Sequence, residues 1–213
     1  MDWLAPDVTP GDAPESVLRL LSTLANRMAS PLNVRATAEA IGMTRERLVT
    51  RLNRLMTTFA AVACPQIDES GVAIPGAQQK VYLLDPLLAS LSNLIEPGVS
   101  MPPMSMISEA ALSMAIARSV EAVHPGRLLE GRAVGYARTA RGEIDFAPVP
   151  IRIAGTEMAT PPIESKWVSD GWRTGARAIE SRYGRGFVAT KNILDLTHTA
   201  WALPAGLLAL LLS

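Results

Sequence analysis

Two short apolar segments carry charged residues at alternating positions, and this feature limits the fold of the chain more than any other. The segments are GEIDF at residues 142–146 and PIESKW at residues 162–167. Because side chains alternate between the faces of a strand, Glu164 and Lys166 point to one face. Charges on a buried face are costly unless they pair or bind a cation. We therefore expect two adjacent strands that hold either an ion-pair network or a cation site.

The acidic residues of these segments suit a hard divalent cation. Mg²⁺ usually takes one or two protein carboxylates together with waters and phosphate oxygens, so Asp145 and Glu164 are the expected ligands, with Mn²⁺ as an alternative ion. Lys166 would orient or deprotonate an attacking water. The chain has three lysines among twenty basic residues, and the pKa of an ammonium shifts on burial more readily than that of a guanidinium. The pattern predicts phosphodiester hydrolysis, and the alternative is a strand pair with an ordinary salt bridge.

The order of these motifs resembles the PD-(D/E)XK nuclease superfamily. Its core is a helix carrying a Glu, a strand with Asp, a strand with Glu-x-Lys, a second helix and a further strand. In this chain the two helices are expected at residues 107–123 and 171–183, and the last strand at residues 187–189. The resemblance implies a restriction-endonuclease-like α/β domain. The catalytic residues that it implies are Lys166, Asp145, Glu164 and Glu109.

The likeness is most specific to the C-terminal half of certain bacterial and archaeal AAA+ family ATPases. In those proteins an ATPase module is followed by a winged helix and a nuclease-like domain. The segment KVYLLDP at residues 80–86 is typical of the region just after the winged helix, and the resemblance covers most of the chain after about Ala13. The chain has no Gly-x-x-x-x-Gly-Lys-Ser/Thr phosphate loop. We therefore expect no ATPase activity from this chain alone. The chain is expected to be a truncated homologue, a fragment, or a partner of a separately encoded ATPase.

The N-terminal half has the pattern of a winged helix-turn-helix. Residues 15–28 carry leucines at helical spacing, and two further helical patterns, 34–41 and 44–59, are joined by Gly42-Met43. The second pattern puts Leu48, Leu52, Leu55 and Phe59 on one side. The strands of the wing are predicted at residues 62–65 and 81–83.

Basic residues gather in this same region. Six arginines and two glutamates between residues 27 and 54 give that segment a net charge of +4, whereas the whole chain is neutral. An arginine-rich recognition helix contacts phosphates and reaches base edges. The alternative is the solvated face of a module that packs between domains. The expected nucleic-acid contacts are Arg45, Arg47, Arg51, Arg54 and, in the second domain, Arg177.

A Pro- and Met-rich run beginning at residue 97 predicts a domain boundary. The single Cys64 excludes an internal disulfide framework and fits a reducing compartment. The start of the chain lacks the order of a secretory signal, and the apolar run at residues 201–212 is shorter than the roughly 20 residues of a spanning helix. We expect a cytoplasmic protein without a membrane segment. The expected organisation is a flexible N-terminus (1–14), a winged helix-turn-helix domain (15–96), a linker (97–105) and a nuclease-like domain (106–213).

Three hypotheses for function follow from the sequence. The first is a metal-dependent nuclease to which the winged helix delivers DNA. The second is a non-catalytic regulatory module that grips DNA or an ATPase partner, or assembles as a homo-oligomer. The third, a small transcription regulator, uses only the winged helix and leaves the C-terminal domain unexplained, so we rank it last.

Overall fold

Helices and short sheets alternate along the chain in the computed structural model, which describes residues 13–96 and 98–212. The fold is mixed α/β, as the sequence predicts. The chain divides into two compact units, which are described separately below: unit 1 is Met1–Ala63 with Gln78–Ala110, and unit 2 is Cys64–Ala77 with Ala111–Ser213. Most of the expected flexible N-terminus, residues 1–12, lies outside the described residues.

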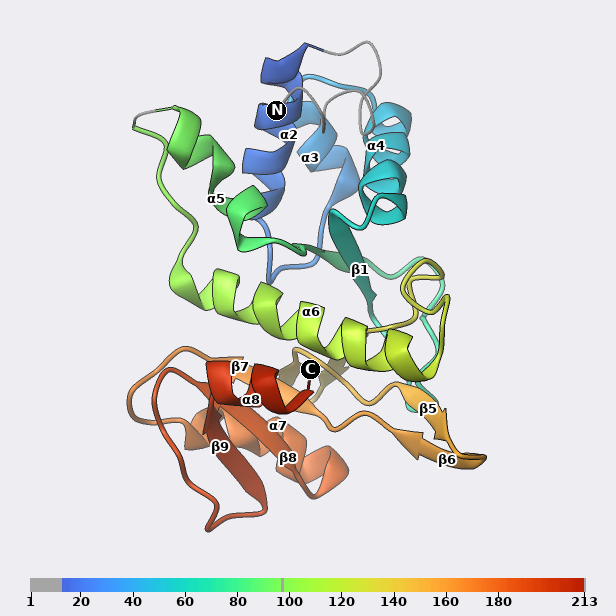
Figure 1. Cartoon of the computed structure of the whole chain (residues 1–213), viewed down its shortest axis with the longest axis vertical. Helices are drawn as coiled ribbons and strands as arrows, with labels where there is room; N and C mark the ends of the chain where they lie inside the picture. The colour runs from blue at the N-terminus through green and yellow to red at the C-terminus, as the bar shows by residue number, and fades with distance from the viewer. Residues whose placement is uncertain (1–12, 97, 213) are drawn as a thin grey trace. The chain divides into compact units, whose positions relative to one another are not determined.

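Unit 1 contains helices and a two-stranded sheet (Figure 1). Helix α2 packs against α5 and β2, and α3 packs against α4. The interior is lined by leucines of α2 and α4 at helical spacing. The bounds are α2 Pro14–Ala25, α3 Val34–Ala40, α4 Arg45–Thr57, β1 Ala61–Pro65, β2 Gln79–Leu83 and α5 Pro86–Ile95.

The turn between α3 and α4 explains why the sequence forms two helices here. Gly42 has φ 70°, a left-handed conformation that favours glycine. Thr44 then caps α4, because its Oγ1 accepts a hydrogen bond from the backbone N–H of Arg47 at 3.2 Å. The helix ends at Thr57, two residues before the predicted end, and Phe59 has φ 56°. Phe59 is therefore 51% exposed, so the prediction that it extends the apolar side of this helix is wrong.

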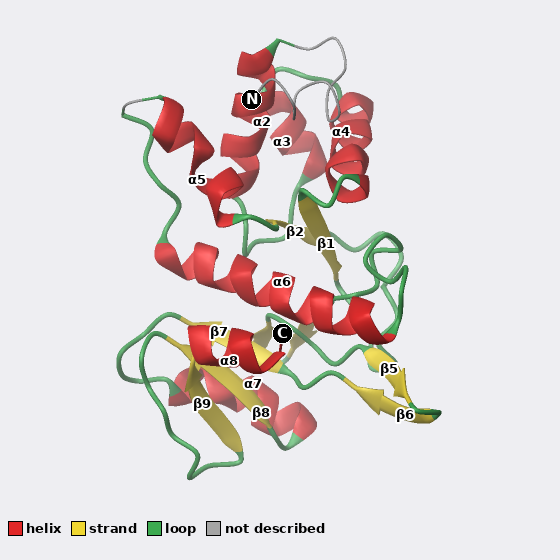
Figure 2. Ribbon diagram, viewed as in Figure 1, coloured by secondary structure: helices red, strands yellow, loops and turns green. Residues whose placement is uncertain are grey.

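Unit 2 is built around a three-stranded parallel sheet in the order β7-β8-β9 (Figure 2). Two antiparallel hairpins, β3–β4 and β5–β6, precede this sheet in the chain. Helix α6, Met104–Val123, begins in unit 1 and ends in unit 2. The strands are β3 Ala137–Thr139, β4 Gly142–Ile144, β5 Pro150–Ile153, β6 Thr156–Ala159, β7 Ile163–Lys166, β8 Gly186–Thr190 and β9 Ala200–Pro204.

Helix α7, Arg173–Tyr183, connects β7 to β8 and packs on the parallel sheet. Trp172 and Ile179 are buried in one apolar cluster with Val188 of β8, as their helical spacing predicts. Helix α8, Ala205–Leu212, follows β9. Among the described residues, no helix is both long and apolar enough to cross a bilayer.

The segments 142–146 and 162–167 are expected to form two adjacent strands, but in the structure they are joined by a single bridge. Strand β4 ends at Ile144, so Asp145 lies just beyond the strand rather than within it. The next residue, Phe146, forms an isolated antiparallel bridge with Ile163 of β7. The two backbone hydrogen bonds of this bridge measure 2.9 and 2.8 Å. The bridge therefore brings the Asp145 segment beside the strand that carries the other two candidate residues.

Candidate functional site

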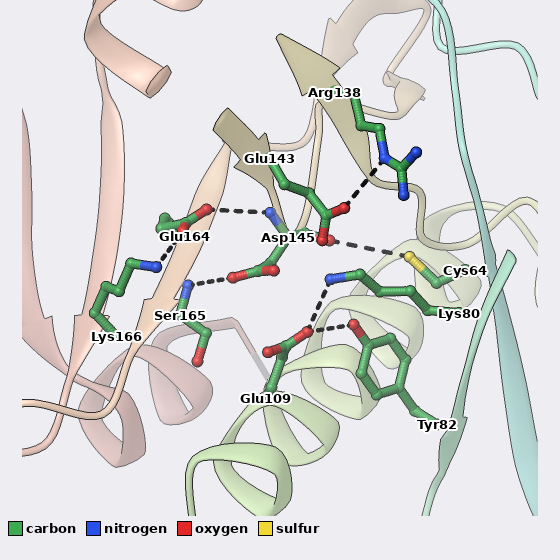
Figure 3. A network of polar contacts seen from close by, with 10 residues as sticks. All are labelled: Cys64, Lys80, Tyr82, Glu109, Arg138, Glu143, Asp145, Glu164, Ser165 and Lys166. Atoms are coloured by element: carbon green, nitrogen blue, oxygen red, sulfur yellow. Dashed lines mark hydrogen bonds and ion pairs between the residues drawn. The ribbon is translucent and has the colours of Figure 1, made fainter. Parts of the chain in front are cut away.

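The carboxylates of Asp145 and Glu164 are each tied to the backbone of the other segment (Figure 3). The backbone N–H of Asp145 donates to Oε2 of Glu164 at 3.3 Å. The backbone N–H of Ser165 donates to Oδ2 of Asp145 at 2.9 Å. Both acidic residues are buried. The sequence prediction that these two acids approach each other is therefore met by reciprocal hydrogen bonds within unit 2.

Lys166 lies on the same face of β7 as Glu164, two residues along the strand. Its Nζ is 2.9 Å from Oε1 of Glu164. The side chain of Lys166 is 40% exposed, whereas that of Glu164 is 8% exposed. The pair therefore has a buried carboxylate at one end and an ammonium that reaches solvent at the other.

Gly175 of α7 provides the room for this ion pair. A Cβ atom at this position would lie 2.8 Å from Cγ of Lys166 and 3.2 Å from Cγ of Glu164. Both neighbours are Cγ atoms, which move only if χ1 of Lys166 or Glu164 changes, so a Cβ here would require these side chains to shift. A glycine in the first turns of α7 thus allows the helix to pack directly over the charged face of β7.

The electrostatics of the site centre on Glu164. The pKa of Glu164 is raised from 4.5 to about 8, mainly by burial and then by the negative charge of Asp145, although Lys166 acts to lower it. A proton on Glu164 relieves the repulsion between the two acids. A bound cation relieves the same repulsion and favours the ionised carboxylate.

Cys64 also belongs to this part of unit 2. Its side chain is buried, and its Sγ lies 4.0 Å from the carbonyl oxygen of Asp145 (Figure 3). The thiol thus packs as a small buried group against the backbone of a candidate metal ligand.

Glu109 has partners in unit 1, where it lies on α6. Its Oε1 accepts hydrogen bonds from Nζ of Lys80 at 3.2 Å and from the hydroxyl of Tyr82 at 2.5 Å (Figure 3). Lys80 is fully buried. The sequence reasoning gave Lys80 no role, although a lysine two residues from a tyrosine in an apolar strand signals a buried polar face that needs an acidic partner.

The candidate arginines of α4 differ in exposure. Arg45, Arg47 and Arg54 are exposed. Arg51 is only 3% exposed, and its guanidinium donates to Oγ of Ser16 at 3.3 Å within unit 1. Burial removes Arg51 from the basic surface that the sequence predicts along this helix.

Arg177 of α7 is exposed, as expected either of a substrate contact or of the solvent-exposed face of this helix. Glu180 of the same helix is paired with Arg173, whose guanidinium donates to Oε1 of Glu180 at 2.9 Å.

The donor set of Asp145 and Glu164 fits a hard cation, because carboxylate oxygens are the ligands that Mg²⁺ and Mn²⁺ prefer. Over the described residues, no group of three or more His, Cys, Asp or Glu side chains is placed to hold a metal ion. Two carboxylates are enough for Mg²⁺, which keeps several of its waters in protein sites. The chemistry of the pair therefore allows a metal site with two protein ligands.

Comparisons with protein-family models, with curated proteins and with solved structures found no match to this chain.

Proposed function

We propose that unit 2 is a metal-dependent nuclease domain that hydrolyses the phosphodiester bonds of DNA. The observation that carries this proposal is a pair of buried carboxylates, each of which accepts a hydrogen bond from a backbone N–H of the other segment, beside the partly exposed side chain of Lys166. Two acids held this close repel each other unless a proton or a cation lies between them. An ordinary surface salt bridge needs neither the second acid nor its burial.

Asp145 and Glu164 would hold Mg²⁺ or Mn²⁺, which supplies a Lewis acid for a phosphoryl oxygen and lowers the pKa of a bound water. The protein residues have separate tasks. The backbone N–H of Ser165 fixes the orientation of the Asp145 carboxylate. Glu164 would hold the ion as a carboxylate. Lys166, whose side chain is partly exposed, would orient the attacking water or hold a proton beside the scissile phosphate.

The finer fold is part of the same proposal. The bridge between Phe146 and Ile163, the parallel pair β7–β8 and the crossover helix α7 support a PD-(D/E)XK arrangement. The order α3, turn, α4, β1 and β2 supports a winged helix-turn-helix. With these two domains we infer a relation to the C-terminal half of AAA+ ATPases, a cytoplasmic location and a separately encoded ATPase as partner.

The test is a cleavage assay on the full chain. Supercoiled, linear and single-stranded DNA are incubated with Mg²⁺, Mn²⁺ or EDTA, and products are resolved on gels. Lys166→Ala is expected to lower the cleavage rate by about 100-fold or more, because it removes the group that orients or deprotonates the water. Lys191→Ala, a change of an exposed lysine in the same unit, is the matched control and is expected to cut normally.

Metal binding is measured separately by calorimetry. Asp145→Asn is expected to abolish Mn²⁺ binding, and circular dichroism checks that the variant is folded. Metal-dependent cleavage that survives Lys166→Ala contradicts the assigned role of this lysine. Absence of both metal binding and cleavage in the unaltered chain contradicts the nuclease proposal as a whole.

The second candidate function is DNA binding without cleavage. The exposed Arg45, Arg47 and Arg54 on α4 support it, because arginines on such a helix bind phosphates in a salt-dependent way. Gel shifts in EDTA test it. Arg54→Glu is expected to weaken binding and to reduce its salt dependence, whereas Arg141→Glu, at an exposed turn of unit 2, is expected to leave binding unchanged.

A further inference from the structure

A groove in unit 2 has no role in the proposed metal chemistry. It lies at the start of the parallel strands, where Pro162 precedes β7, Gly186 begins β8 and Thr199 precedes β9. Its volume is about 830 Å³, within the range of small-ligand sites of roughly 300–1,000 Å³. We call it the aromatic groove, after the side chains of Tyr183, Phe187 and Trp201 that line it.

Two of these aromatic side chains lie side by side on neighbouring strands. Phe187 of β8 and Trp201 of β9 are register partners, and their ring centroids are 6.0 Å apart in an edge-to-face arrangement. Trp201 is nevertheless 45% exposed. A large aromatic ring that stays open to solvent in a hollow surface offers a flat face on which a planar ligand can stack.

The charge of the groove favours an anionic ligand. None of its described lining residues is an Asp or a Glu, while Arg185 and His198 line it. His198 lies 3.7 Å from the carboxylate of Asp195, so Arg185 is the cation that carries this argument. Arg185 is exposed, so its guanidinium is accessible to a phosphate. A ligand with planar rings and negative charges matches both properties. A proline-rich peptide also stacks on aromatic rings, but it brings no negative charge for Arg185.

The floor of the groove requires close packing. A Cβ atom at Gly186 would lie 2.6 Å from the carbonyl oxygen of Pro162, so only glycine lets the two strand starts approach this closely. As a result, Pro162 and Gly186 line the groove beside Phe187.

We propose that the aromatic groove binds the bases of single-stranded nucleic acid. Bases stack on Trp201 and Phe187, and Arg185 pairs with the phosphate backbone. In a duplex the faces of each base are covered by stacking on the neighbouring base pairs, so the groove selects single strands, whose base faces are free to stack on protein rings. Glu164 and its register partner Val188 face α7, so Phe187 and Trp201 lie on the opposite face of the sheet. The groove is therefore separate from the candidate metal site and needs no metal itself.

The test measures binding of a fluorescently labelled oligothymidylate to the full chain by anisotropy in EDTA. Trp201→Leu is expected to raise the Kd about 5- to 150-fold, the effect of losing one base stack. Trp201→Phe keeps a ring and is expected to retain most of the affinity. Arg185→Glu is expected to weaken binding most at low salt. Leu211→Ala, which alters an exposed apolar side chain of α8, is the matched control and is expected to have no effect.

Unchanged affinity in Trp201→Leu overturns the proposal, as does equal competition by a duplex of the same length. Tighter binding of a proline-rich peptide than of the oligonucleotide also overturns it. Because the assay contains EDTA, its outcome is independent of the nuclease proposal. Oligonucleotide binding that persists in Lys166→Ala while cleavage is lost supports both assignments, and cleavage without groove-dependent binding supports the nuclease alone.

Discussion

Each unit contains one buried glutamate paired with a lysine, and the two pairs differ in what surrounds them. In unit 1, Lys80 and Glu109 are 3.2 Å apart, and their side chains are 0% and 9% exposed. In unit 2, Lys166 and Glu164 are 2.9 Å apart, but Lys166 is 40% exposed. The first pair is enclosed at both ends, whereas the second opens to solvent at its cationic end.

The two pairs also differ in the residue that lies next to each glutamate. Glu109 receives a second hydrogen bond from the hydroxyl of Tyr82, which helps to satisfy a buried carboxylate. Glu164 instead has the carboxylate of Asp145 close enough to raise its pKa. In the first pair the carboxylate is satisfied by a lysine and a tyrosine, whereas the second places two acids beside one lysine, an arrangement that a proton or a cation stabilises. The comparison teaches that the same two residue types acquire different roles through a third neighbour.

The strongest test of this comparison is the stability of Lys80→Ala. Removing the ammonium leaves Glu109 buried without its cation, which is expected to lower the free energy of unfolding by about 3–5 kcal/mol. Lys166→Ala is expected to cost about 1 kcal/mol, because water reaches the end of that pair. Urea denaturation followed by circular dichroism measures both.

The exposed Lys191→Ala serves as the control and is expected to change stability by less than about 0.5 kcal/mol. Equal losses in Lys80→Ala and Lys166→Ala would remove the distinction between the two pairs.

A second test uses pH. The pKa of Glu164 is about 8 in the folded chain and 4.5 in the reference state, so the folded chain binds the proton more tightly. The contribution of Glu164 to the free energy of unfolding is therefore fully present below pH 4.5 and is lost as the pH rises to about 8, by an amount on the order of a few kcal/mol. Glu164→Gln has no proton to lose and is expected to flatten this decline, as seen in melting curves from pH 4.5 to 8.5. A decline of the same size in the variant would assign it to other groups.

A third test is Gly175→Ala, whose expected effect is smaller than that of Lys80→Ala. Alanine normally stabilises a helix by about 1 kcal/mol relative to glycine, but here its Cβ meets Cγ of Lys166 at 2.8 Å. The clash is expected to reverse the sign and to destabilise the chain by about 1–3 kcal/mol. Gly206→Ala in α8, where a Cβ meets nothing within 4 Å, is the control and is expected to be neutral or stabilising. Thermal melting of both variants tests whether the packing of α7 over the Lys166–Glu164 pair requires glycine at position 175.

Much of the fold could be predicted because its signals are local. Helix α6 was expected at residues 107–123 and spans Met104–Val123, and α7 was expected at 171–183 and spans Arg173–Tyr183. The strands at 62–65 and 81–83 are confirmed within β1 and β2. Hairpin β5–β6 was missed, because its turn uses Ala154 and Gly155, both with positive φ, and lacks the Asn-Gly or Asp-Gly signal of such turns.

The candidate site was predictable only in part. Strand alternation placed Glu164 and Lys166 on one face, and their 2.9 Å separation agrees with it. Periodicity did not reveal the burial of Arg51, which depends on its contact with Ser16, thirty-five positions away in the chain. It also did not reveal the Lys80–Glu109 pair, whose members are twenty-nine positions apart. Such pairs are set by tertiary packing, which spacing within one element does not encode.

The contact between Cys64 and Asp145 makes the one thiol of the chain a reporter of local opening. A buried thiol reacts with a disulfide reagent only when the structure around it opens, so the labelling rate measures how often this part of unit 2 exposes its interior. A ligand held by the Asp145 carboxylate binds the closed form alone and slows that reaction. The labelling rate of Cys64 thus reports whether a ligand is bound at Asp145, and no additional cysteine has to be introduced by mutation.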